Sequence, residues 1–259
     1  MKTVSFTNYK GGCTKTTSAV GLGSALSLKG YKVLLVDMDP QSHVALHLGV
    51  NAHELPVGIE DILESRNRSI GEAIVKASQD NLYFVPSRRR LLQARATLAN
   101  RAGRDALLAR AARDLNGTFD FMLIDSPPDE GILSLNAMYA SQYIIIPTTL
   151  EELSLGGINP VISSILDLRD AYESKHWDIL GVLINRFDAR SRMGNTYALN
   201  VLADAFGQNE VVFDTKIRTD EQTKRAIRHG KTIHQYKSDS KAAIDYMFLA
   251  DEILDRFET

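Results

Sequence analysis

A glycine-rich loop between a hydrophobic strand and a helix is the feature of this sequence that most constrains its fold. The loop reads Asn8-Tyr9-Lys10-Gly11-Gly12-Cys13-Thr14-Lys15-Thr16-Thr17. The apolar stretch around Val4 and Phe6 predicts a strand before it, and the stretch from Ser18 to Leu28, rich in Ala, Leu and Ser, predicts a helix after it. At such a junction the backbone N–H groups and the positive end of the helix dipole attract phosphate. The sequence therefore predicts a phosphate-binding loop.

Two residues of the loop have the chemistry that a bound nucleotide requires. Lys15 stands where a P-loop places a cation on the β- and γ-phosphates, and Thr16 stands where it places a hydroxyl on Mg²⁺. Thr14 departs from the common pattern, which has glycine at this position, and a β-branched residue accepts a positive φ poorly. The alternative is a lysine-containing turn that binds nothing. The fixed offsets of the motif favour phosphate binding.

Composition limits the other classes of protein. The chain has 259 residues, so we expect a single domain spanning residues 1–259, and because it begins at its first predicted strand we expect no N-terminal helix-turn-helix domain. Its formal net charge is −2. A net charge near zero gives no overall attraction for polyanions, so contacts with nucleic acid need a local basic patch. Cys13 is the only cysteine, which excludes a disulfide framework. With no signal peptide and no spanning apolar run, we expect a cytoplasmic protein.

Apolar runs alternate with helical patterns along the chain. The predicted strands after the first are residues 33–36, 82–85, 121–124, 143–146, 179–184 and 211–217. This alternation predicts an α/β fold with a mostly parallel twisted sheet and helices on both faces. Ligands of such sheets bind at the carboxyl ends of the strands, where the phosphate loop would lie.

Three carboxylates follow predicted strands and are candidates for magnesium chemistry. Asp37 and Asp39 end the run Val33-Leu-Leu-Val-Asp37-Met38-Asp39-Pro40-Gln41, and on an extended strand they would point to the same side. Asp125 ends the run Phe121-Met-Leu-Ile-Asp125, the form of a Walker B motif, and would hold Mg²⁺ through water. A pair of acids that merely ends a strand is the alternative.

The loop and the carboxylates together resemble the ParA/MinD family of ATPases. The form K-G-G-x-x-K-[ST]-T, with the extra Lys10, is similar to the deviant Walker A box of that family, and V-D-x-D-P-Q is similar to its second signature. The resemblance implies a P-loop fold that binds ATP and Mg²⁺ and closes into a homodimer, in which Lys10 reaches the nucleotide of the partner. It further implies that Asp39 positions the attacking water and that Asp37 joins Thr16 and Asp125 around the metal.

The same resemblance extends to the nucleotide base. Asn185 ends a strand similar to the one whose terminal Asn contacts adenine in the family, and Ile217 with Arg218 resembles a segment that usually continues as Ile-Pro-Arg. The implied catalytic residues are Lys10, Lys15 and Asp39. The implied ATP-binding residues are Lys10, Gly11, Gly12, Cys13, Thr14, Lys15, Thr16, Thr17, Asn185, Ile217 and Arg218. A buried Asn185 that only caps a turn is the alternative.

Small Soj-like members of the ParA family bind DNA without sequence preference and release it after an adaptor of the ParB type stimulates hydrolysis. A local basic patch agrees with this expectation. The candidate DNA-binding residues are Arg190, Arg192, Arg218, Lys224, Arg225 and Arg228. A solvated helix face is the alternative, as it is for the arginines of residues 87–113.

Other functions of the same superfamily stay open to different degrees. A MinD-like membrane-cycling ATPase would need a basic amphipathic end, whereas residues 251–259 are acidic. An iron-protein reductase needs more cysteines than Cys13. A metabolic ATP-dependent ligase has no need for Lys10. Within the positioning family, plasmid or chromosomal DNA is the expected cargo, and a protein cluster or an organelle such as a carboxysome is the second candidate.

Overall fold

The chain folds around one seven-stranded sheet. A computed structural model describes residues 1–65, 67–150, 159–172, 177–188 and 211–258. Within these residues the strand order is β3-β4-β2-β5-β1-β6-β7, and only the pair β3 and β4 is antiparallel. The strands are β1 (Lys2–Phe6), β2 (Val33–Asp37), β3 (Val75–Lys76), β4 (Leu82–Val85), β5 (Phe121–Asp125), β6 (Tyr143–Thr149) and β7 (Asp178–Asn185). The predicted α/β class with a mostly parallel sheet is confirmed.

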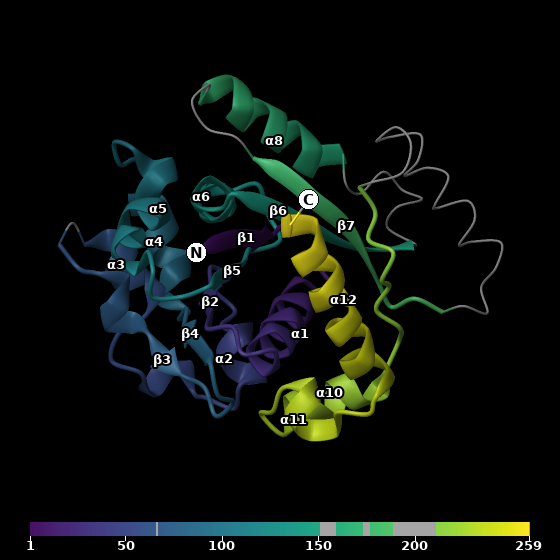
Figure 1. Cartoon of the computed structure of the whole chain (residues 1–259). Helices are drawn as coiled ribbons and strands as arrows, with labels where there is room; N and C mark the ends of the chain where they lie inside the picture. Colours follow the sequence, from purple (N-terminus) through teal and green to yellow (C-terminus); the bar gives the residue numbers. More distant parts are fainter. Residues whose placement is uncertain (66, 151–158, 173–176, 189–210, 259) are drawn as a thin grey trace.

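Helices cover both faces of this sheet (Figure 1). One face is covered by α1 (Lys15–Leu28), α2 (His43–His47), α10 (Glu221–Arg228), α11 (Ile233–Lys237) and α12 (Lys241–Glu258). The other is covered by α3 (Ile59–Glu64), α4 (Arg90–Ala99), α5 (Leu107–Ala111), α6 (Ile132–Ala140) and α8 (Asn159–Ala171). The two helical layers are therefore separated by the sheet.

Strand β2 illustrates why this sequence needs two helical layers. Val33 and Leu35 pack into the core on the α1 side, and Leu34 and Val36 pack into the core on the α3 side. Successive side chains of a strand point to opposite faces, so a continuous apolar run demands cover on both. The strand ends at Asp37, where the first polar side chain appears.

Helix α12 lies against α1 in the first layer (Figure 1). Gly21 of α1 makes this possible, because a Cβ atom there would lie 2.5 Å from the ring of Tyr246. The close approach brings the acidic side of α12 next to the segment that follows β7. None of the helices in the described ranges is both long and apolar enough to cross a bilayer.

The predicted strand over residues 211–217 is wrong. In its place the segment makes two isolated bridges, Val182 with Val212 and Phe187 with Arg218. Between them, the backbone N–H groups of Asp214 and Thr215 donate to the carboxylate of Glu252 on α12, at 2.8 and 2.9 Å. A carboxylate from a distant helix thus takes the hydrogen bonds that a sheet neighbour would have taken.

Candidate nucleotide-binding site

The glycine loop joins β1 to α1 and presents the amino end of that helix. Helix α1 begins at Lys15, three residues before the predicted start at Ser18. Gly12 has a φ of +87° and Thr14 a φ of +66°, so the chain passes twice through the left-handed region. The first turn of a helix leaves its N–H groups without intrahelical acceptors. Such N–H groups, together with the helix dipole, form an anion-binding site.

Thr14 adopts the conformation that its side chain disfavours, as the sequence pattern indicated. The left-handed region costs a residue with a Cβ atom about 1–2 kcal/mol relative to glycine, although glycine loses more chain entropy on folding. We expect Thr14→Gly to raise the free energy of unfolding by about 1 kcal/mol. Urea denaturation of the nucleotide-free protein measures this. Thr14→Ala is the control, because alanine keeps the Cβ atom; an equal gain in that variant would contradict the explanation.

Lys15 lies inside the loop, and in the described part of the chain no acid forms an ion pair with its ammonium. Its ammonium donates to the carbonyl oxygens of Asn8, at 2.7 Å, and Lys10, at 3.2 Å, and the residue is 7% exposed. Lys10 itself is exposed. Cys13 is buried and its thiol donates to the Lys10 carbonyl at 3.1 Å. The loop therefore holds one lysine inward and leaves the other outward.

Asn8 is a residue of this loop that the sequence reasoning did not single out. It is fully buried, its side-chain NH₂ donates to the Pro147 carbonyl at 2.8 Å, and its side-chain oxygen accepts from the Lys10 N–H at 3.0 Å. Asn8 thus ties the loop to the end of β6. The signal available in the sequence was a polar residue placed directly between a strand and the glycines.

Thr16 and Asp125 form the part of the site that fits Mg²⁺. The Thr16 hydroxyl donates to Asp125 Oδ2 at 2.5 Å, while the other oxygen, Oδ1, is buried and has no hydrogen-bond partner among the described residues. Burial raises the pKa of Asp125 to about 7, and the Thr16 hydrogen bond and the Lys15 charge oppose the shift. Mg²⁺ prefers carboxylate, hydroxyl and water oxygens. A buried acceptor without a donor, beside a hydroxyl, is the arrangement that such an ion would complete.

Asp37 lies opposite Asp125 on the neighbouring strand, and it also has a structural role. The two residues are in register between β2 and β5. Both Asp37 oxygens accept backbone N–H groups, one from Asp39 at 2.9 Å and one from Val44 at 3.1 Å. Burial and the Asp125 charge raise the pKa of Asp37. Asp37 therefore fixes the turn that leads into α2, and its part in holding a metal stays a prediction.

Asp39 lies beyond the strand, so the argument that Asp37 and Asp39 share one side of an extended strand is wrong. Strand β2 ends at Asp37, and Asp39 sits in the turn that follows. Its Oδ1 accepts from the Gln41 N–H at 2.9 Å, and its carbonyl accepts from the hydroxyl of Ser87 at the end of β4. Asp39 is 8% exposed. Its other carboxylate oxygen has no partner in the described part of the chain and is available to a water.

A cavity of about 400 Å³ lies between the loop and the segment after β7. It brings together Thr14 and Thr17 of the phosphate loop with Asn185, Ile217 and Arg218. The Asn185 side-chain oxygen accepts from the Ser18 hydroxyl at 3.3 Å, whereas its buried NH₂ group has no hydrogen-bond partner within the described ranges. An unpaired amide donor in a cavity beside the phosphate loop fits the edge of a purine base. Contacts of these residues with adenine stay a prediction.

The predicted basic patch is smaller in the structure than in the sequence. The Arg218 guanidinium donates to both carboxylate oxygens of Asp245 of α12, at 2.6–3.0 Å, and Lys224 pairs with Glu221 at 3.0 Å. Arg190 and Arg192 lie outside the described residues. Arg225 and Arg228 have no acidic partner within the described ranges. These two arginines of α10 are the strongest of the candidates that remain.

Comparison with known proteins identifies the family of the chain. A family described as an AAA domain matches residues 1–177. The sporulation initiation inhibitor protein Soj of Bacillus subtilis is 31% identical over 97% of this chain and 98% of its own length. The chromosome-partitioning ATPase Soj of Treponema pallidum is 32% identical over 98% of both chains. The chain belongs to the ParA/MinD family of ATPases. The resemblance seen in the sequence is thereby confirmed.

A solved structure of this fold holds the expected ligands. Cobyrinic acid a,c-diamide synthase from Mycobacterium smegmatis, with bound ADP and magnesium, is 30% identical and has a TM-score of 0.82, covering 100% of this chain and 96% of its own. The same fold therefore occurs both in partition ATPases and in a protein named for a biosynthetic reaction.

Proposed function

We propose that this chain is a ParA-type partition ATPase that binds ATP with Mg²⁺ and hydrolyses it slowly. The main observation in support of the proposal is that the two lysines of one loop differ in burial. Lys15 is buried and points inward, whereas Lys10 is exposed. Lys15 would meet the phosphates of its own nucleotide, and Lys10 would meet those of a second copy. ATP would therefore close a homodimer with two nucleotides at its interface.

The chemistry follows from the residues around the loop. Thr16 and Asp125 would hold Mg²⁺, which neutralises charge on the β- and γ-phosphates. Asp39, with a free carboxylate oxygen, would orient the attacking water, and the other oxygen is fixed by the Gln41 N–H. Asn185 and the backbone near Ile217 would contact adenine. Slow hydrolysis gives the bound state time to act before a ParB-type or other adaptor ends it.

The dimer would bind duplex DNA of any sequence and act on the nucleoid in the cytoplasm. Arg225 and Arg228, exposed on α10, are the described residues that support this step. Because the chain carries a net charge of −2, the affinity must come from a local patch, which a dimer presents twice. The cargo would be plasmid or chromosomal DNA, with a protein cluster or organelle as the second candidate.

Salt titration tests the DNA step. We expect Arg225→Glu and Arg228→Glu each to weaken binding of the ATP-bound protein to unrelated duplexes. The slope of log affinity against log salt should fall by about 0.9 for each phosphate that the protein no longer neutralises. Arg89→Glu is the control, because Arg89 is exposed on the side of the sheet that α4 covers and the substitution changes the charge by the same amount. Unchanged affinity in both α10 variants, with weaker binding in the control, would move the DNA surface to the arginines of residues 87–113.

A biosynthetic ligase is a further candidate, ranked behind the positioning of a protein cluster or organelle, because the fold of the M. smegmatis structure matches the whole chain at a TM-score of 0.82. The two functions make opposite demands on Lys10, since a ligase that works on a small acceptor has no use for an exposed lysine directed at a second nucleotide. ATP turnover measured with duplex DNA or with cobyrinic acid separates them. Turnover raised by cobyrinic acid and indifferent to DNA would favour the ligase.

A further inference from the structure

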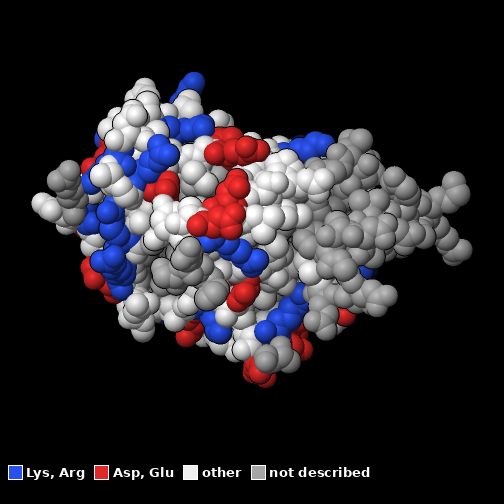
Figure 2. Space-filling view, turned by 90° about the horizontal axis from the view of Figure 1, so that it is seen from above, with Lys and Arg blue, Asp and Glu red and all other residues white. Residues whose placement is uncertain are grey.

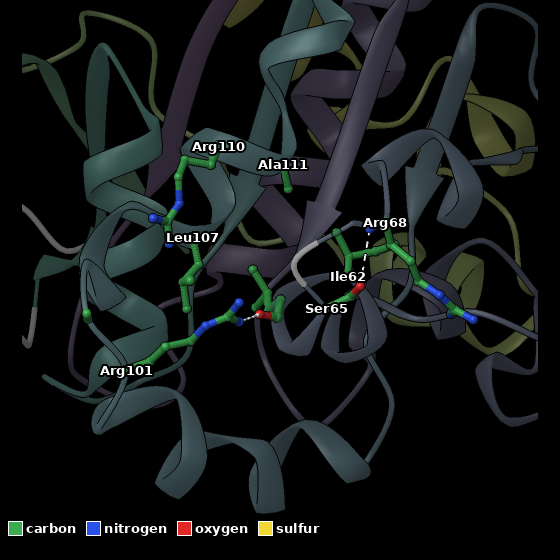
Figure 3. A pocket seen from close by; sticks show the side chains of 9 residues that line it. Ile62, Ser65, Arg68, Arg101, Leu107, Arg110 and Ala111 are labelled. Carbon is green, nitrogen blue, oxygen red and sulfur yellow. Dashed lines mark hydrogen bonds between the residues drawn. The ribbon is translucent and has the colours of Figure 1, made fainter.

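A pocket of about 400 Å³ lies on the face of the sheet opposite α1, away from the nucleotide site. It is formed by the end of α3, the residues after α4, and α5 (Figure 3). The residues that line it are Ile62, Leu63, Ser65, Arg68, Arg101, Ala102, Leu107, Arg110 and Ala111. Three are arginines, and among the described residues no Asp or Glu lines the pocket. A volume of this size lies in the range of ligand sites.

Two of these arginines are held in place without being neutralised. Arg101 donates from Nη1 to the carbonyl oxygens of Leu63, at 2.6 Å, and Glu64, at 3.3 Å, at the end of α3. Arg110 donates from Nη2 to the carbonyl of Gly103 at 3.2 Å. A guanidinium has five N–H donors, so the rest of each fork stays available. Backbone carbonyls thus orient both side chains and leave their charge uncompensated.

Other arginines of the same region form ion pairs with acidic side chains. Arg88 pairs with Glu60 and Asp61, Arg90 pairs with Asp61 and Glu64, and Arg95 pairs with Asp129. Arg68 approaches Glu72 at 3.7 Å, with both side chains about half exposed, which is a weak contact. Within the described ranges, Arg101 and Arg110 are therefore the arginines of this pocket that lack an acidic partner.

The floor of the pocket is apolar, which narrows the kind of occupant. Apart from its arginines and Ser65 the residues that line it are apolar, and Ile62 and Leu107, which are 2% and 5% exposed, face one another across it (Figure 3) at the edge of the core on this side of the sheet. A DNA backbone, which is polar and convex, gains nothing from an apolar floor. An acidic segment of protein with one large apolar side chain would match both the floor and the cations. Arginine forks suit carboxylates because they bind them with two parallel hydrogen bonds.

From this charge complementarity we infer that the pocket between α3 and α5 docks an acidic segment of a partner protein, with an apolar side chain over Ile62 and Leu107 and carboxylates on Arg101 and Arg110. Figure 2 shows basic side chains with some acidic ones between them along the left side of the molecule, the side that carries α3, α4 and α5 in Figure 1, and such basic side chains attract an acidic partner from a distance. The surface is separate from the nucleotide site, so a partner can occupy it in any nucleotide state.

A peptide library tests the inference on the full chain. The probe is a positional-scanning set of fluorescein-labelled octapeptides, amidated at the carboxyl end and read by anisotropy. We expect enrichment of Asp and Glu around a single Leu, Ile or Phe. Arg101→Gln and Arg110→Gln should each weaken the best peptide about tenfold, as expected when a charged hydrogen bond is removed. Arg113→Gln, an exposed arginine outside the pocket, is the matched control and should bind as the unchanged protein does.

Arg101 also caps α3, so a second variant separates docking from folding. Ala111→Trp fills the pocket with no change of charge and should weaken the best peptide as much as the arginine variants do, with an unchanged thermal melt. No acidic preference in the library would overturn the inference. Equal binding by the control and by the pocket variants would overturn it too, as would a peptide without its apolar residue binding equally well. If a 20-base-pair DNA duplex, added at the same total concentration of negative charge, displaced the bound peptide, the pocket would be a general polyanion surface and the inference would be overturned.

Discussion

Lys15→Ala is expected to weaken ATP binding by at least about 100-fold, because each charged hydrogen bond to a phosphate contributes about 1.5–3 kcal/mol. The Lys15 ammonium donates to the carbonyl oxygens of Asn8 and Lys10 at 2.7 and 3.2 Å, and none of the described acids forms an ion pair with it. It is therefore free to turn to a phosphate. Isothermal titration with a non-hydrolysable ATP analogue and Mg²⁺ measures the decrease in affinity.

Lys10→Ala is the matched control for this variant, since it removes a lysine five positions earlier in the same loop. Lys10 is exposed, so its removal should leave the affinity of a single chain for nucleotide nearly unchanged. If Lys15→Ala bound the analogue within a few-fold of the unchanged protein, the loop would not be the phosphate site. An equal decrease in both variants would mean that the two lysines act on the same nucleotide.

Asp39→Ala is expected to keep ATP binding and to lower the hydrolysis rate by at least about 100-fold, because a water without its orienting carboxylate rarely attacks in line. The backbone of Asp39 is held independently of its side chain, by the Asp37 carboxylate and the Ser87 hydroxyl. The turn should therefore survive the substitution. Release of phosphate under single-turnover conditions gives the rate.

The exposed Asp80 provides the control for this variant, because its side chain is 93% exposed and far along the chain from the loop. Asp80→Ala should hydrolyse ATP at the unchanged rate. Wild-type turnover by Asp39→Ala would remove Asp39 from the mechanism. Loss of binding as well as turnover would mean that the carboxylate holds the metal instead of the water.

The local features of the fold could be predicted from the sequence. The loop, the buried strand β2 and the carboxylates at the strand ends all lie within short stretches, where residue type and spacing carry the information. These features place the phosphate end of the site without any knowledge of distant contacts.

The features that could not be predicted from the sequence depend on contacts with α12, which lies at the far end of the chain. Glu252 takes the backbone N–H groups of residues 214 and 215 and so removes an expected strand, and Asp245 takes the guanidinium of Arg218. Neither partner is visible in a local pattern. The same holds for Arg101 and Arg110, whose lack of acidic partners within the described ranges separates them from the paired arginines nearby only once α3 and α5 are placed.

Light scattering of the intact protein in three nucleotide states tests whether ATP joins two copies through Lys10. The Asp39→Ala variant, which should retain its ATP, is expected to change from 28.7 kDa to about twice that mass with ATP and Mg²⁺, but not with ADP or without nucleotide. The double variant with Lys10→Ala and Asp39→Ala should keep the mass of one chain even with ATP and Mg²⁺. An identical mass in all three states, or a dimer that forms equally well without Lys10, would contradict the account.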